Sequence, residues 1–129
     1  MSDAGDVLVV DGDASIRNLL EVVVRMLPRR AVAAADGRSA VALLSSHTFD
    51  ALVLDLILPE MSGAEVLRFV AAHAPDLLPR TVVVTTLPEN GWSGIDEVRS
   101  CAAVLHKPFS LDELQTALRS CCHDGAGNA

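Results

Sequence analysis

Four polar residues with complementary chemistry stand at the ends of short apolar segments in this sequence. Asp11 and Asp55 each close an apolar run, and Thr85 closes a β-branched run. Lys107, the only lysine of the chain, follows a fourth such segment. Two carboxylates can hold Mg2+, which prefers oxygen ligands, or one of them can act as a nucleophile toward phosphorus. A hydroxyl and an ammonium would then supply the hydrogen bond and the positive charge that phosphoryl transfer requires.

The segments that carry these residues alternate regularly between strand and helix patterns. Strands are predicted over Val7–Val10, Ala31–Ala35, Ala51–Asp55, Thr81–Thr85 and Ala103–His106. Apolar spacing and capping residues predict five helices. The first runs from Asp13 to before Pro28, and the second from Asp36 to about Ser46. The third ends before Pro75, the fourth lies near Ile95–Cys101, and the fifth begins at Ser110. Residues 87–94 are rich in glycine and proline, so we expect a loop there.

Five βα units in alternation predict an α/β fold with a doubly wound parallel sheet. Right-handed crossovers leave few topologies, and the flavodoxin-like (βα)5 order 2-1-3-4-5 is favoured. In that order the four polar residues follow neighbouring strands at one edge of the sheet, so we expect them to converge on one pocket. Taken singly, each aspartate could instead be a turn or cap residue, and the lysine a solvated surface group.

Composition limits the function further. At 129 residues we expect a single domain, with a core over about residues 6–122 and a frayed tail over 123–129. The net charge of −7 argues against direct nucleic-acid binding. The acidic start and short apolar runs resemble neither a signal peptide nor a membrane span, so we expect a cytoplasmic protein without membrane contact. The three cysteines are expected to be reduced thiols.

An ordered set of motifs gives the sequence a family resemblance. It is similar over about residues 6–122 to a response-regulator receiver domain of the CheY-like superfamily, the phosphoacceptor module of two-component signalling. The motifs that carry the resemblance are Val9-Val10-Asp11 with Arg17 downstream, Leu54-Asp55 through Gly63, Val84-Thr85-Thr86, and Lys107-Pro108-Phe109.

The resemblance implies a role for each pocket residue. Asp55 would be the phosphoacceptor, and Asp11 would belong to the acidic Mg2+ pocket. The backbone carbonyl of Ile57 would be a further metal ligand. Thr85 would bond the phosphoryl oxygen and shift on activation, and Lys107 would pair with the phosphate. The peptide bond that follows this lysine would be cis, as is usual in the family.

The sequence departs from the family pattern at several positions. Gly12 stands where the family has a second acid that binds Mg2+, so we expect weak Mg2+ binding. Asp13 could partly replace that ligand, although helix capping is the better-supported role of its side chain. Val104 stands where an aromatic switch residue is common. Ile57 and Leu87, at two positions that influence phosphate hydrolysis, are apolar, which predicts a long-lived phosphoryl group.

Three functional hypotheses follow. In the first, a histidine kinase or histidine phosphotransfer protein phosphorylates Asp55, and the domain switches an output domain or effector protein, with no enzymatic turnover beyond its own phosphorylation. The chain would be a stand-alone regulator or one domain of a longer protein. In the second, Gly12 and Val104 mark a pseudo-receiver that binds partners without phosphorylation. In the third, Asp11 and Asp13 serve a haloacid-dehalogenase-type phosphatase, although the capped helix after Lys107 replaces the acidic pair that family needs.

Overall fold

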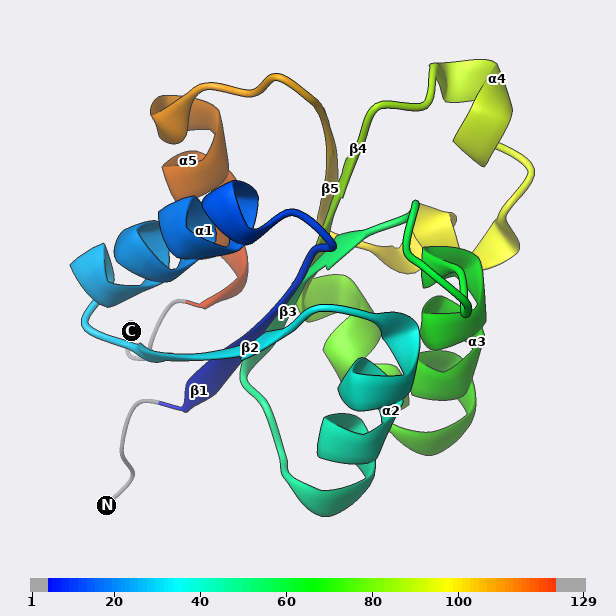
Figure 1. Cartoon of the computed structure of the whole chain (residues 1–129), viewed down its shortest axis with the longest axis horizontal. Coiled ribbons are helices and arrows are strands. Elements are labelled where there is room, and N and C mark those ends of the chain that lie inside the picture. The colour runs from blue at the N-terminus through cyan, green and yellow to red at the C-terminus, as the bar shows by residue number, and fades with distance from the viewer. Residues whose placement is uncertain (1–4, 123–129) are drawn as a thin grey trace.

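A five-stranded parallel sheet with helices on both faces makes up residues 5–122, the part of the chain that the computed structural model describes (Figure 1). The strand order is β2-β1-β3-β4-β5, which confirms the predicted topology. The strands are β1 (Asp6–Val10), β2 (Arg30–Ala34), β3 (Ala51–Asp55), β4 (Thr81–Thr85) and β5 (Ala103–His106). The second strand therefore begins and ends one residue before the predicted range.

Each face of the sheet packs against its own set of helices. Alternate side chains of β1 divide between the faces, with Val7 and Val9 in one core cluster and Leu8 and Val10 in the other. The first cluster lies under α1 (Ala14–Met26) and α5 (Leu111–Cys121). The second lies under α2 (Gly37–Ser46), α3 (Gly63–His73), and the 3₁₀ helices η1 (Pro75–Arg80) and η2 (Asp96–Ser100). Burial on both faces explains why β1, β3 and β4 are continuous apolar runs in the sequence, whereas the edge strands β2 and β5 are only partly buried.

Side-chain caps fix where the helices begin. The Asp13 carboxylate accepts hydrogen bonds from the backbone N–H groups at the start of α1, and Asp36 does the same for α2. Ser110 and Glu113 form the predicted capping box of α5, and a second capping box opens α3 at Ser62. These caps satisfy backbone donors that helix ends would otherwise leave unpaired, and they place each helix start beside the strand that precedes it.

The segment between β4 and η2 differs from the prediction. A single helical turn, α4 (Glu89–Trp92), forms inside the range expected to be a loop. Trp92 is partly buried and packs against the core cluster under α2 and α3, so tertiary contacts outweigh the low helix propensity of Gly91. The helix expected near Ile95–Cys101 is the shorter 3₁₀ helix η2.

No helix within residues 5–122 has both the length and the apolar character needed to cross a membrane. The longest of these helices, α1, has 13 residues, whereas a spanning helix needs about 20. The predicted frayed tail over 123–129 lies outside the described residues.

Candidate functional site

Lys107 joins the two aspartates at the carboxyl edge of the sheet. Its Nζ donates hydrogen bonds to Oδ2 of Asp11 at 2.7 Å and to Oδ2 of Asp55 at 3.0 Å. The register of β1 and β3 pairs Val10 with Leu54, so the next residue of each strand is an aspartate at the same level. Both carboxylates are buried, with residue exposures of 1% and 6%. The peptide bond between Lys107 and Pro108 is cis, as expected.

Backbone groups hold the remaining oxygens of the two carboxylates. The N–H of Asp13 donates to Oδ1 of Asp11 at 2.9 Å, and the N–H of Ile57 donates to Oδ1 of Asp55 at 3.0 Å. Arg17 reaches back from α1 and donates from Nη1 to the carbonyl of Asp11 at 2.8 Å. Each carboxylate therefore has one oxygen on the ammonium and one on a backbone donor, which fixes its orientation.

The electrostatics of this cluster reflect its burial. Burial raises the pKa of Asp55 above its usual 3.8, against the opposing effects of the Ile57 N–H and of Lys107. For Lys107, burial alone would lower the pKa, but hydrogen bonds and charge from Asp11 and Asp55 raise it above 10.5. The lysine is therefore held as an ammonium, and the Asp55 carboxylate is less stabilised as an anion than a solvated aspartate.

Thr85 lies beside this cluster without a side-chain hydrogen bond to it in residues 5–122. Its hydroxyl accepts from the N–H of Leu87 at 3.0 Å, and its carbonyl accepts from the N–H of Lys107 at 2.7 Å. Next to it, Nε2 of His106 lies 3.2 Å from the Thr86 carbonyl, an interaction that ties the loop after β4 to the end of β5. Sequence reasoning missed His106, because a histidine before the lysine carries no motif signal.

A close backbone approach fixes the loop that follows Asp55. The N–H of Gly63, at the start of α3, donates to the carbonyl of Leu56 at 3.0 Å. A Cβ atom at this glycine would lie only 2.5 Å from the Cα of Leu56 and would clash with the Asp55 carbonyl. Only glycine allows α3 to begin directly against the backbone of the predicted acceptor.

The oxygen donors available to a metal are few. Asp11 and Asp55 supply two carboxylates, and Gly12 adds no side chain. The Asp13 carboxylate caps α1 through the N–H groups of Ser15 and Ile16, at 2.8 and 3.3 Å. Within residues 5–122, no three His, Cys, Asp or Glu side chains gather closely enough to hold a metal ion. Two carboxylates with a backbone carbonyl are compatible with Mg2+ that keeps several of its waters.

Comparison with known proteins identifies the family. A family model described as the response regulator receiver domain matches residues 7–119. The chain belongs to this family. The receiver domain is 31% identical over 128 residues to Response regulator MprA of Mycolicibacterium vanbaalenii, a match that covers 95% of this chain and 54% of the relative. The chain spans about half the length of the curated relatives it matches.

Solved structures agree on the fold. A CheY-like response regulator receiver domain protein from Methanospirillum hungatei superposes with a TM-score of 0.86 at 19% identity, covering 98% of this chain and 100% of the other. Response regulator TrrA of Thermotoga maritima, in complex with Mg2+ and BeF, gives a TM-score of 0.79 at 23% identity, with coverages of 90% and 97%. The protein is thus a receiver domain of the two-component type, with the flavodoxin-like fold.

Proposed function

We propose that this receiver domain accepts a phosphoryl group on Asp55 from a histidine kinase or a histidine phosphotransfer protein. The contact between Lys107 and the paired carboxylates of Asp11 and Asp55 carries the proposal. A carboxylate oxygen of Asp55 would attack the phosphorus of the donor phosphohistidine, and the bond from phosphorus to the imidazole nitrogen would break. The product is an acyl phosphate on Asp55, and the imidazole keeps the electron pair of the broken bond.

The neighbours of Asp55 suit this transfer. Burial raises the pKa of Asp55, which makes its carboxylate a better nucleophile, while the N–H of Ile57 and the ammonium of Lys107 keep it oriented. Lys107 lies where it could neutralise charge on the phosphoryl oxygens. Asp11, Asp55 and the Ile57 carbonyl would hold Mg2+, which when bound adds further positive charge at those oxygens. With two carboxylates, this binding should be weak.

Thr85 links phosphorylation to the surface. Its hydroxyl would turn to donate a hydrogen bond to a phosphoryl oxygen. It would then lose the hydrogen bond that it now accepts from the N–H of Leu87. The loop after β4 would be freed at that point, and the contact of His106 with the Thr86 carbonyl would pass the change to β5. An output domain or effector protein would recognise the altered surface. The domain would turn over no external substrate.

The acyl phosphate should persist once it forms. The side chains two residues beyond Asp55 and Thr85 are Ile57 and Leu87, and neither can orient an attacking water. Ile57 is 51% exposed, so its apolar side chain lies at the protein surface close to the acceptor. A half-life of seconds for the phosphorylated protein would contradict this part of the proposal.

A second candidate function is a pseudo-receiver that works without phosphorylation. Gly12 and Val104 favour it, because each replaces a side chain that the resemblance to phosphorylated receivers implies. The buried contact between Lys107 and the two aspartates favours phosphoacceptance instead, since a binding module has no need to retain it.

One experiment distinguishes phosphoacceptance from the pseudo-receiver function. The purified protein is incubated with acetyl phosphate and Mg2+, and its intact mass is followed by mass spectrometry. Phosphoacceptance predicts the addition of one phosphoryl group to the wild type and to the control Asp112→Asn, which alters an exposed carboxylate on α5. It predicts no addition to Asp55→Asn. A folded wild-type protein that gains no mass over a range of Mg2+ concentrations would support the pseudo-receiver.

A further inference from the structure

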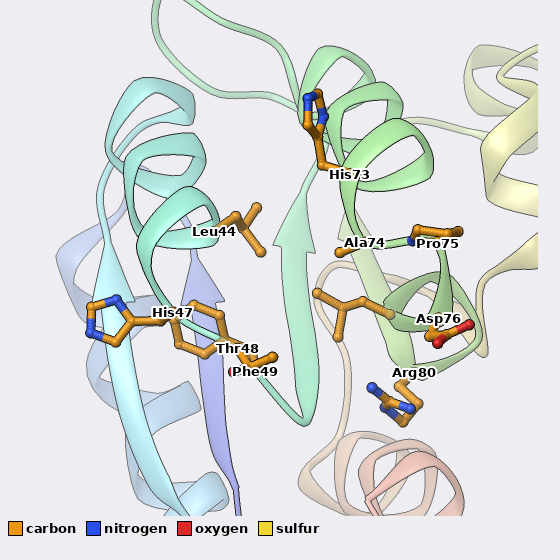
Figure 2. Close-up of a pocket in the computed structure, with 10 residues that line it drawn as sticks. Leu44, His47, Thr48, Phe49, His73, Ala74, Pro75, Asp76 and Arg80 are labelled. Carbon is orange, nitrogen blue, oxygen red and sulfur yellow. The ribbon is translucent and has the colours of Figure 1, made fainter.

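Figure 2 shows a cavity, of about 380 Å³, lined by residues from 44–49 and 73–80. These residues adjoin the starts of β3 and β4, at the opposite end of the sheet from Lys107. One wall of the cavity comes from the last turn of α2 and the segment that leads into β3, and the other from the end of α3 and from η1 (Pro75–Arg80). Its volume is in the range of small-molecule sites in proteins. We propose that this cavity binds a small organic carboxylate with an apolar body. This site is separate from the phosphoacceptor and does not depend on it.

The floor of the cavity is apolar and belongs to the protein core. Phe49 and Leu77 line it and are only 6% and 3% exposed, and the half-buried Leu44 packs against the same core cluster. Figure 2 shows Leu44 and Phe49 on the α2 side, with Arg80 and Asp76 across from them. Binding a ligand with a ring or a branched apolar chain would remove apolar surface of this floor and of the ligand from water, which is favourable. A purely polar ligand would not gain this free energy.

Arg80 supplies the group that would hold a carboxylate. Its Nε donates to the backbone carbonyl of Asp50 at 2.7 Å, and this is the only hydrogen bond of its guanidinium in residues 5–122. The two Nη groups therefore remain available for a ligand. Asp50 is itself fixed, because its N–H donates to the Asp6 carbonyl at 2.8 Å and its carboxylate pairs with Arg29. A half-buried guanidinium in a fixed orientation is suited to bidentate recognition of a carboxylate.

The other polar groups of the rim favour a monoanion over a phosphate. Asp76 carries negative charge on the same rim as Arg80, so a dianion would meet repulsion. Each of the two imidazoles has one ring nitrogen in a local contact: Nδ1 of His47 lies 2.9 Å from the Ser46 hydroxyl, and Nδ1 of His73 lies 3.1 Å from the Phe69 carbonyl. One cation and one anion suit a simple carboxylic acid or an α-amino acid, whose ammonium would face Asp76.

A titration followed by ¹H–¹⁵N NMR tests the proposal on the unphosphorylated protein. The probes are 3-phenylpropionate, phenylalanine, and the neutral 3-phenylpropanamide. We expect saturable shifts at the amides of Thr48, Phe49 and Leu77, with a Kd near the millimolar range for a ligand of this size. The amide should bind about tenfold more weakly than the acid. Tighter binding of phenylalanine would assign the ligand to the amino acids, and tighter binding of 3-phenylpropionate to the simple acids. No saturable shift with either acid overturns the proposal.

Variants separate recognition from general effects. Arg80→Gln should weaken 3-phenylpropionate about tenfold, whereas Arg68→Gln, which removes an exposed arginine of α3, should leave binding unchanged. Thr48→Phe places an aromatic ring at the exposed mouth and should abolish binding while Arg80 stays in place. Unchanged affinity in a natively folded Arg80→Gln overturns the proposal. If that variant does not fold, unchanged affinity in Thr48→Phe does so.

Discussion

Replacing Gly12 with aspartate should tighten Mg2+ binding by this receiver domain. Gly12 directly follows Asp11 at the site and is exposed to solvent. A Cβ atom there would lie 3.5 Å from Cδ of Pro59 and 3.9 Å from the Ala35 carbonyl, which are ordinary contacts. The backbone therefore accepts a side chain at this position without rearrangement, and the substitution tests the charge of the pocket alone.

The size of the effect follows from the charges already present. Asp11, Asp55 and Lys107 together carry a formal charge of −1, and a further aspartate makes it −2. A divalent cation about 4 Å from one added carboxylate gains about 2 kcal/mol at the water-like dielectric of an exposed position. That free energy corresponds to about a thirtyfold lower Kd. Without the metal, the added charge repels Asp11 and Asp55 and should cost the fold up to about 1 kcal/mol.

Isothermal titration calorimetry with MgCl2 measures the change directly. Gly12→Asn is the matched control, since it adds a side chain of the same size without charge. We expect Gly12→Asp to bind Mg2+ about thirtyfold more tightly than the wild type, and Gly12→Asn to bind it as the wild type does. The Tm of Gly12→Asp should fall in EDTA and rise with Mg2+. Equal tightening in both variants, or none in Gly12→Asp, would show that the added charge does not control Mg2+ binding.

Three further predictions concern stability and reactivity. Asp55→Asn should raise the Tm at pH 7 by roughly 3–5 °C. Because folding raises the pKa of Asp55 above the usual 3.8, its ionised form destabilises the folded state as the pH rises above 3.8, and asparagine removes that charge. The gain should vanish in thermal melts below that pH, and a loss at pH 7 would contradict it. Gly63→Ala should lower the free energy of unfolding by about 2–3 kcal/mol in urea titrations, since its Cβ would clash with the backbone of Asp55 and Leu56. Gly94→Ala is the control, because its added Cβ would meet no non-adjacent atom of residues 5–122 within 4 Å, and it should stay within about 0.5 kcal/mol of the wild type. Burial and the charge of Glu97 raise the pKa of Cys101 from 9.0 to about 12, so iodoacetamide at pH 8 should alkylate it roughly a thousandfold more slowly than in urea. Alkylation rates of Cys101 are measured by peptide mass spectrometry, and similar rates in the folded protein and in urea would contradict the prediction.

Most of the fold was predictable from the sequence because local signals and packing agree. Continuous apolar runs ending at Asp11 and Asp55 mark strands that are buried on both faces. The convergence of these residues with Lys107 then follows from strand order alone, since parallel strands end at one edge. The helix starts at Asp13 and Ser110 were equally clear, because their capping side chains act on backbone a few residues away.

Features that depend on contacts between distant segments could not be predicted. The turn α4 forms because Trp92 packs on the core, whereas its own glycine argues for a loop. The contact of His106 with Thr86 joins β5 to the loop after β4 and has no local signature. The cavity beside Arg80 is lined by residues from two separate segments, 44–49 and 73–80, so nothing in either segment alone indicates it.

Mapping the phosphorylated residue tests whether Asp55 is the phosphoacceptor. The protein is incubated with acetyl phosphate and Mg2+ and treated with borohydride, which reduces an acyl phosphate of aspartate to homoserine, and its peptides are sequenced by mass spectrometry. We expect homoserine at position 55 and aspartate at positions 11 and 13. Homoserine at position 11 with Asp55 intact, or no homoserine in a natively folded sample, would contradict it.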